Sequence, residues 1–536
     1  MIRTESVRRS TLTTTFSYLL GKPLNLAVSV LVAYRFGTGA QLEAFFWAMV
    51  LLAQLHGYVL GNWGLAAVPV LVGLDTSEPS AVPRFVGFIT FWSTLLALGS
   101  AGLLYFLAPF AVERLTRFDG PTAALATDLL PLLLPYYLFF SFHSVQVSLL
   151  QAFAVFTVPA LLENVLRSLI LIALLLAFSD HGILALVLAN DVAQGVLWVL
   201  VAGMLIRRGV LVARWYLTLP RSQFAAFWHL LWPFYVTQLV DSATELLARF
   251  LLTGRTHGGL AFVGWAERVV QWVSGPLHGG VAKVMLTDFS ALAAKHGKKA
   301  AVDRCVEAVS LTWFFVVPLS AYLFFFGDLV LALLFRRGAF DQHSVEQSYL
   351  ALRWLSLGLI ATSAHYFTTR VYYALGDSII GLYTCLPALG VAIGLNLWLE
   401  ATLGFEGVAL AQTLLTSYSV VLLGCILHLR HAPLPYRHLG SRLLLFGSLA
   451  FPLVGLARLL LDDVLPRPQV QPTLVLLALV ALTFMLFAGL YCGVCRWLRL
   501  PECTLFAQSL DRFWKRKYPG RQGGSDAPPT LPRGAP

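Results

Sequence analysis

The sequence predicts an all-α integral membrane protein with about fourteen transmembrane helices. Of its 536 residues, 58% are hydrophobic and 12% are charged, and the mean hydropathy is +0.75. Soluble domains carry about 25% charged residues, roughly twice this fraction. The apolar residues also form blocks about as long as a bilayer is thick, without the alternation of barrel strands. Helices are therefore the expected spanning elements.

The apolar blocks are separated by charged breaks or by breaks rich in Gly and Pro. No cleavage site follows the polar N-terminus, so we expect no cleaved signal peptide, and the polar segment after Arg496 should be disordered. Spans are expected near residues 12–34, 42–71, 85–111, 127–152, 155–178, 182–206, 224–253, 260–287, 308–335, 345–375, 378–400, 405–428, 440–462 and 471–495.

The basic residues predict how the chain is oriented. With the N-terminus inside, twenty-three of the 38 Lys and Arg residues fall in inner loops or the C-terminal tail, and eight fall in outer loops. This asymmetry predicts a multi-pass protein with an even number of spans and both termini in the cytoplasm. It also accounts for the net charge of +11, so we predict no nucleic-acid partner. The Cys492–Cys495 pair lies in an apolar run and is expected to pack rather than bind metal.

Ionisable residues within the predicted spans are the candidates for function, because a charge in a bilayer needs a partner or a wet cavity. Two helix pairs at i,i+4 spacing, Glu163–Arg167 and Glu245–Arg249, are expected to neutralise one another. The adjacent Glu267 and Arg268 must point in different directions. Together with Lys283 on the same helix, Arg268 predicts a cationic cavity suited to a phosphate or pyrophosphate.

A second pattern predicts a cation site. Asn396 and Glu400 stand at i,i+4 on one expected helix without a basic neighbour, and oxygen side chains are what a hard cation needs. The alternative is that Glu400 only marks the end of the helix. There is no P-loop and no set of nucleophile, base and orienting residue, so we predict a non-enzyme that depends on an ion gradient or the membrane potential.

Several segments together resemble the lipid II flippases of the MurJ (MviN) family. The resemblance rests on FGTGAQLEAFFWA at 36–48, the segment at 260–290 with its AERVVQ step, FRRGAFD at 335–341, YYALGD at 372–377 and LGFEGVALAQT at 403–413. These motifs occur in order and with similar spacing to about residue 430. The resemblance implies the fold of the multidrug/oligosaccharidyl-lipid/polysaccharide exporter superfamily, with two six-helix lobes around a cationic cavity and a final helix pair that forms a groove for a lipid tail.

The implied organisation divides the chain into six parts. They are a cytoplasmic N-terminus at 1–10, a first lobe at 11–206, a cytoplasmic linker at 207–223, a second lobe at 224–430, the final helix pair at 431–500 and a cytoplasmic tail at 501–536. We expect a monomer in the bacterial inner membrane, in contact with lipids and with a lipid-linked saccharide pyrophosphate.

The resemblance also implies roles for individual residues. Arg268 falls on the family's cavity arginine and Glu43 on an acidic position of its second helix. Lys283 and Arg370 are further expected substrate-binding cations. The positions that bind sodium in some members fall on Asp241, Asn396, Glu400 and Thr416.

The first lobe departs from the family pattern. Tyr18 and either Leu24 or Asn25 replace arginines of the first helix, and His56 and Asn62 stand where a basic residue and an acid–glycine step are expected. The cations available there to compensate are Lys22 and Arg35, and we include Lys22, His56 and Asn62 among the expected substrate-binding residues. Because of these departures, we expect the first lobe to bind a pyrophosphate more weakly than the family pattern implies.

The function that the sequence predicts is translocation of an undecaprenyl-pyrophosphate-linked saccharide, lipid II or a similar precursor, by alternating access. A flippase for an exopolysaccharide or O-antigen repeat unit stays open as an alternative. A drug/cation antiporter of the same superfamily would require an acidic, aromatic cavity, and an integral-membrane transferase would require a catalytic acid or His that the sequence does not offer.

Overall fold

The computed structural model describes residues 7–153, 155–210, 215–254, 256–276, 282–377, 379–462, 473–500 and 502–503, and every regular element in these ranges is helical. The elements are α1 (Val7–Phe36), α2 (Ala40–His56), η1 (Gly57–Gly61), α3 (Trp63–Ser77), η2 (Pro79–Ala81), α4 (Val82–Leu115), α5 (Gly120–Leu132), α6 (Leu134–Ala152), α7 (Thr157–Leu161), η3 (Leu162–Leu166), α8 (Arg167–Ala177), η4 (Ser179–His181), α9 (Ile183–Arg207), α10 (Arg221–Leu252), α11 (Gly259–Pro276), α12 (Ala282–His296), α13 (Lys298–Phe335), α14 (Gln342–Ala374), α15 (Ile380–Leu403), α16 (Phe405–Arg430), α17 (Tyr436–Asp462) and α18 (Thr473–Trp497).

The all-helical membrane fold is confirmed, whereas the exact number of spans stays a prediction. Within the described residues, ten helices or continuous helix runs are long and apolar enough to cross a bilayer, or eleven when the bent pair α5–α6 is counted as one span. The three other predicted spans fall on α10, α11 and α14, which carry Asp241, Glu245, Arg249, Glu267, Arg268, Arg353 and Arg370. Buried charge lowers the hydropathy of these helices, so composition alone does not identify them.

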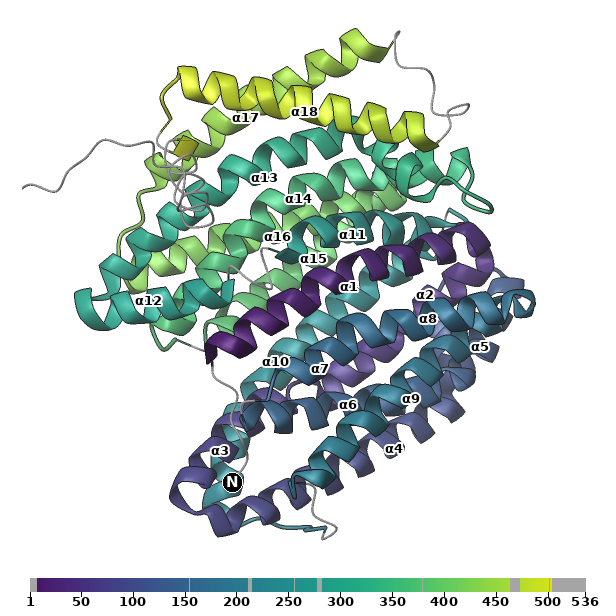
Figure 1. The fold of residues 1–536 in the computed structure, drawn as a ribbon, viewed down its shortest axis with the longest axis vertical. Coiled ribbons are helices and arrows are strands. Elements are labelled where there is room, and N and C mark those ends of the chain that lie inside the picture. Colours follow the sequence, from purple (N-terminus) through teal and green to yellow (C-terminus); the bar gives the residue numbers. More distant parts are fainter. Residues whose placement is uncertain are drawn as a thin grey trace, which may run out of the picture.

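The helices form two groups that follow the order of the chain (Figure 1). The helices from α1 to α9 pack mainly on one another, with α6 on α9, α2 on α5 and α8 on α9. The second group is built around α13, α14, α15 and α16, and α17 and α18 cover the outer side of α13. Helix α10 contacts both α15 and α3, so it connects the two groups. The residue boundaries predicted for the lobes stay a prediction.

The first group contains a helix break between α5 and α6 and a π-helical turn at η3. Helices α5 and α6 meet at 47° beside Pro131 and Pro135, because each proline lacks a backbone N–H donor. The backbone N–H of Tyr136 at this break donates to Asp191 Oδ1 at 3.0 Å, which gives the buried carboxylate a structural partner. The π-helical turn η3 contains Glu163 and ends directly before Arg167.

This π-helical turn overturns one expectation. Among the described residues no ion pair joins Glu163 to Arg167; the Arg167 guanidinium lies 6.0 Å from the ring centre of Tyr136 instead. A π turn takes more residues than an α turn, so side chains four positions apart are no longer stacked. The predicted Glu163–Arg167 pair is therefore wrong, whereas the predicted Glu245–Arg249 pair is confirmed at 2.6 Å.

The two helix groups meet at one end of the bundle through the loop after α1, and we call this contact the Gly37 closure. The Ala339 N–H donates to the Tyr34 carbonyl at 2.8 Å, and the Trp265 indole donates to the Gly37 carbonyl at 3.1 Å. The hydroxyls of Thr38 and Ser344 lie 2.9 Å apart. Gly37 has a φ of +54°, and a Cβ there would strike the Ala339 carbonyl, so the close approach requires glycine.

A second contact, the Trp63 closure, joins the groups nearer the opposite end, where α10 packs on η1 and α3. The Trp63 indole donates to the Tyr235 hydroxyl at 2.8 Å, and that hydroxyl donates to the Val59 carbonyl at 3.0 Å. Trp63 also packs edge-on against Phe227, with ring centres 5.6 Å apart. A cavity lined by α1, α2, α10 and α11 lies between the two groups.

Candidate functional site

The first cavity between the groups, which we call the basic cavity, has a volume of about 430 Å³. It contains three cationic side chains and one carboxylate, so its net charge is positive. Its lining residues come from α1 (Lys22, Asn25, Ser29), α2 (Phe46, Met49, Val50, Ala53), α10 (Arg249) and α11 (Leu260, Gly264, Glu267, Arg268, Gln271, Trp272). A cavity of this charge suits an anionic ligand such as a pyrophosphate.

Arg268 is held in the basic cavity by one hydrogen bond and two aromatic faces. Its Nη1 donates to the Ser29 Oγ at 3.1 Å, and its guanidinium lies 4.9 Å from the ring centre of Phe46 and 5.0 Å from that of Trp265. A guanidinium has five N–H donors in a fixed plane, and Ser29 is the only described residue that accepts one. No other described residue accepts a hydrogen bond from this guanidinium, so its remaining donors can bind the oxygens of an anion.

Lys22 brings a second cation from α1 to the same cavity. Its ammonium lies 4.5 Å from the ring centre of Tyr18, one turn earlier on the helix. Helix α11 approaches closely here, because a Cβ at Gly275 would meet both the Tyr18 hydroxyl and the Lys22 ammonium. Lys22 and Arg268 therefore line one cavity from the two helix groups.

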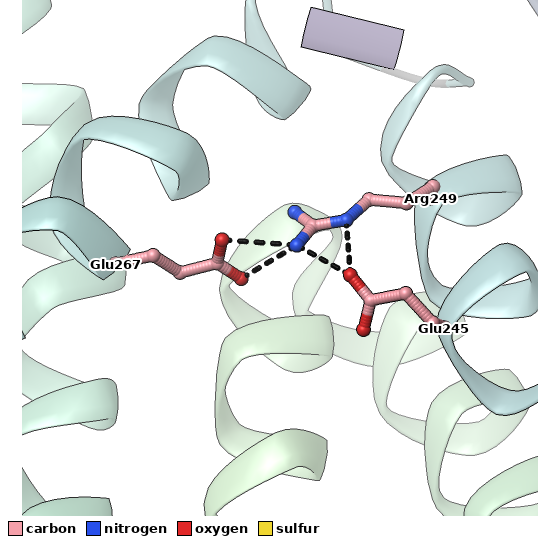
Figure 2. A network of polar contacts seen from close by, with 3 residues as sticks. All are labelled: Glu245, Arg249 and Glu267. Carbon is pink, nitrogen blue, oxygen red and sulfur yellow. Dashed lines mark hydrogen bonds and ion pairs between the residues drawn. The ribbon is translucent and has the colours of Figure 1, made fainter. Parts of the chain in front are cut away.

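A chain of three charged residues separates the basic cavity from its neighbour, and we call it the Arg249 bridge (Figure 2). Arg249 on α10 binds both carboxylate oxygens of Glu267 on α11, at 3.0 and 2.9 Å from Nη2. The Arg249 Nε also donates to the Glu245 Oε1 at 2.8 Å. Glu267 thus pairs with Arg249 and not with the adjacent Arg268, although both residues line the basic cavity.

The second cavity, which we call the acidic cavity, has a volume of about 290 Å³. The charged residues that line it are three carboxylates and Arg249. The complete lining is Val240, Asp241, Thr244, Glu245, Ala248, Arg249, Leu252, Val263, Glu267, Ala388, Asn396, Val408, Gln412, Leu415, Thr416 and Ser419. A third cavity of about 500 Å³, lined in part by His229, His365 and Tyr373, shares Asp241 and Ser419 with it.

Three of the four residues predicted for a cation site meet in the acidic cavity: Asp241, Asn396 and Thr416. Asn396 is 3% exposed, and its amide nitrogen donates to the Ala392 carbonyl at 2.9 Å. Its Oδ1 is buried and accepts no hydrogen bond from any described residue. The fourth residue, Glu400, is not among the lining residues; it lies 3.6 Å from Arg117 of the first group.

The other predicted substrate-binding residues lie away from the basic cavity in the described structure. Glu43 is 5% exposed and accepts the Leu260 N–H at 3.1 Å, at the start of α11. His56 pairs with the Ser141 hydroxyl at 3.0 Å within the first group. Asn62 contacts the Phe234 carbonyl at 3.5 Å, beside the Trp63 closure.

Two further predicted cations also lie apart from this cavity or outside the description. The Arg370 guanidinium lies 5.3 Å from the ring centre of Tyr366 and 5.8 Å from that of Tyr373 on α14. Lys283 begins α12, but its side chain is not among those the structure describes.

Part of the lining of the basic cavity was not predicted from the sequence, although the sequence holds a signal for it. Lys22, Asn25 and Ser29 stand at i, i+3 and i+7, which is one face of a helix, and all three line the cavity. A polar stripe of this kind on an apolar span predicts a wet surface. The contribution of α2 could not be found this way, because its four lining side chains are apolar.

Comparison with known proteins identifies the family of this chain. A family model described as "Lipid II flippase MurJ" matches residues 32–481. The chain belongs to the MurJ family. The match extends beyond residue 430, where the sequence motifs end, and includes α17 and the first part of α18. The resemblance seen in the sequence is thereby confirmed.

Individual relatives of the MurJ family support the same assignment. The chain is 25% identical over 415 residues to a probable lipid II flippase MurJ of Thermotoga maritima, covering 75% of this chain and 80% of the relative. It is 24% identical over 392 residues to the lipid II flippase MurJ of Burkholderia cenocepacia, covering 69% and 73%.

Solved structures show that the fold is that of the MurJ family and its superfamily. A lipid II flippase MurJ in an inward closed conformation matches with a TM-score of 0.74 at 19% identity, covering 91% of this chain and 99% of that one. An inward-facing multidrug transporter of the MATE family and MOP superfamily matches with a TM-score of 0.65 at 15% identity, covering 80% and 99%. The predicted superfamily fold is confirmed.

Proposed function

We propose that this chain is a flippase that moves an undecaprenyl-pyrophosphate-linked saccharide, lipid II or a similar precursor, across the bacterial inner membrane. The observation that carries the proposal is the basic cavity, in which Lys22 of the first helix group and Arg268 of the second face one space. A pyrophosphate is the part of such a lipid that these cations would bind. The family relationship favours lipid II as the substrate.

In an alternating-access cycle, the Gly37 closure and the Trp63 closure would act as the two gates. In the structure the Gly37 closure and the Trp63 closure are both formed, with the basic cavity between them. A transport cycle would release one closure at a time, so that the head group is exposed to one side only. Helices α17 and α18 expose apolar side chains such as Leu459 and Leu474, which fits contact with lipid tails.

The orientation predicted from the basic loops places the Trp63 closure on the cytoplasmic side and the Gly37 closure on the outer side. Both termini would then lie in the cytoplasm. We also propose that the chain acts as a monomer and as a transporter rather than an enzyme, since the basic cavity needs only to bind and release its ligand.

The acidic cavity supports sodium as a coupling ion. Asp241, Asn396 and Thr416 offer oxygen ligands there, and the unpaired, buried Asn396 Oδ1 is an acceptor that a cation would satisfy. Where the cavity meets the third cavity, Asp241 lines both, which gives an ion a route to the site. Sodium bound here would neutralise part of the excess negative charge of the cavity.

A sodium titration of the purified protein tests this site. Sodium chloride, compared with choline chloride at equal ionic strength, should raise the thermal midpoint of the wild type, because a ligand of the folded state stabilises it. Asp241→Asn should remove most of this sodium-dependent increase. An increase of the same size in Asp241→Asn would show that the ion binds elsewhere.

Substitution of Arg268 tests the flippase proposal in cells depleted of their own lipid II flippase. The wild-type chain should restore growth, and Arg268→Ala should abolish rescue, because truncation removes a charged, bidentate anion ligand worth about 1.5–3 kcal/mol per hydrogen bond. Arg304→Ala is the matched control, since Arg304 forms exposed ion pairs with Asp288 and Glu307 away from both cavities. Full rescue by well-expressed Arg268→Ala would contradict the proposal.

The same assay separates lipid II from another lipid-linked saccharide. The basic cavity lacks any cation from α2, which is consistent with a changed head group. A wild-type chain that binds undecaprenyl pyrophosphate but fails to restore growth would indicate an exopolysaccharide or O-antigen precursor.

A further inference from the structure

The two cavities carry opposite charge and share a wall. The charged residues lining the basic cavity are Lys22, Arg249 and Arg268 against Glu267. Those lining the acidic cavity are Asp241, Glu245 and Glu267 against Arg249. Arg249 and Glu267 line both cavities, so the Arg249 bridge is in contact with any ligand on either side.

The Arg249 bridge holds one cation between two carboxylates in a secluded position. The Arg249 side chain is 9% exposed, that of Glu267 is 17% exposed and that of Glu245 is 31% exposed. One guanidinium nitrogen, Nη2, contacts both carboxylates. The bridge also connects α10 to α11, so a change of partners would alter how these two helices are held together.

We infer that Arg249 couples the two cavities, so that an anion in the basic cavity and a cation in the acidic cavity favour each other's binding. This inference rests on the proposed function. A cation held at Asp241, Asn396 and Thr416 lies in the cavity that Glu245 and Glu267 also line, so it supplies these carboxylates with a counter-charge in place of Arg249. The released guanidinium can then turn to the oxygens of an anion beside Arg268.

The direction of the coupling follows from the cost of unpaired buried charge. An anion that binds alone must draw Arg249 away from two carboxylates, and a partly buried carboxylate without a partner is strongly disfavoured. A cation that binds alone leaves the guanidinium without its partners. When both ligands are present, the charges exchange partners and none is left uncompensated. Coupling of this kind must be reciprocal.

Titration of the purified, full-length protein in nanodiscs tests the inference. Inorganic pyrophosphate is titrated calorimetrically in sodium chloride and in choline chloride of equal ionic strength, and sodium is titrated with and without pyrophosphate. Sodium should tighten pyrophosphate binding by about fivefold or more, the lower limit of typical allosteric coupling. Pyrophosphate should tighten sodium binding by the same factor. Two ligands that bind independently to the wild type would overturn the inference and leave the proposed function intact.

The variants distinguish the bridge from simple attraction between two bound ions. Arg249→Gln should reduce the coupling factor to about one, whereas direct attraction would persist without the arginine. If this variant does not fold, Glu267→Gln breaks the same contact from α11 and should have the same effect. Unchanged coupling in either folded variant would overturn the inference.

A matched control uses an ion pair outside both cavities. Arg353 on α14 and Glu406 on α16 lie 2.8 Å apart and are partly buried like the bridge. Glu406→Gln should keep the wild-type coupling factor, and loss of coupling there would show that any buried pair has this effect. A wild type that binds no pyrophosphate at all would contradict the anion site of the proposed function and the inference together.

Discussion

At the scale of single residues, the buried carboxylates of this protein differ in what they contact. Glu267 binds Arg249 and lines both cavities, whereas Glu43 accepts a backbone N–H at the start of α11. A helix N-terminus has unpaired N–H groups and a partial positive charge, so it is a suitable partner for a buried carboxylate. In the structure Glu43 therefore has the surroundings of a structural residue.

Two substitutions of Glu43 test this role. Glu43→Ala leaves the buried Leu260 N–H without its acceptor and should lower the free energy of unfolding by about 1–3 kcal/mol. Glu43→Gln keeps an acceptor oxygen, so thermal denaturation of the purified protein should show a smaller loss. Glu43→Gln should also support growth in the flippase-depleted strain. A variant with wild-type stability but no rescue would instead place Glu43 in contact with the substrate.

At the scale of helices, the loops that follow α1 and α13 form the Gly37 closure between the two helix groups. The loop between α1 and α2 lies against the loop between α13 and α14. Across this boundary the Tyr34 carbonyl accepts the Ala339 N–H, and the Gly37 carbonyl accepts the Trp265 indole N–H from α11. Gly37 and Gly338 both have positive φ there, and a Cβ at Gly338 would strike the Tyr34 carbonyl. The contact is therefore close enough to be locked by a covalent bond.

A cysteine pair across this closure should stop transport. The Thr38 and Ser344 hydroxyls lie 2.9 Å apart, which is compatible with a disulfide after Thr38→Cys and Ser344→Cys. In a background without the native cysteines, oxidation should crosslink the pair, abolish flippase activity and be reversed by reductant, because the outer closure could not open. The single variants should be insensitive to oxidation. Activity of the fully crosslinked protein would show that this closure stays shut during transport.

At the scale of the whole molecule, charge is distributed across the bundle in two separate ways. The loops and the tail carry the basic excess that sets the orientation, whereas the interior carries two cavities of opposite sign. The two distributions are separate along the chain: the basic excess lies in loops and the tail, whereas Arg249, Glu245 and Glu267 pair in the interior. The net charge of +11 therefore says little about the transported ligand.

Fusion reporters test the predicted orientation. Green fluorescent protein fused to either terminus should fluoresce, because it folds only when it stays in the cytoplasm. Alkaline phosphatase inserted in the loop near Gly37 should be active, since it requires the oxidising outer compartment. Active phosphatase at the C-terminus would reverse the predicted orientation.

The sequence by itself determined the helical membrane class, the resemblance to the MurJ family and the position of Arg268 on a charged helix. These features depend on composition, hydropathy and local spacing, which are readable along the chain. The predicted Glu163–Arg167 pair failed because a π turn at 162–166 changed the helical spacing. Helices α10, α11 and α14 do not qualify as spans by composition alone, since their charged residues reduce hydropathy.

Only the tertiary structure decided which polar residues share a space. It brought Lys22 from α1 to Arg268 on α11, joined Glu267 to the Glu245–Arg249 pair, and placed Glu400 beside Arg117, outside the lining of the acidic cavity. These contacts connect residues far apart in sequence, and their energies depend on burial and distance rather than on local pattern. For the same reason, the Arg249 bridge between two cavities could be seen only once α10 and α11 were packed together.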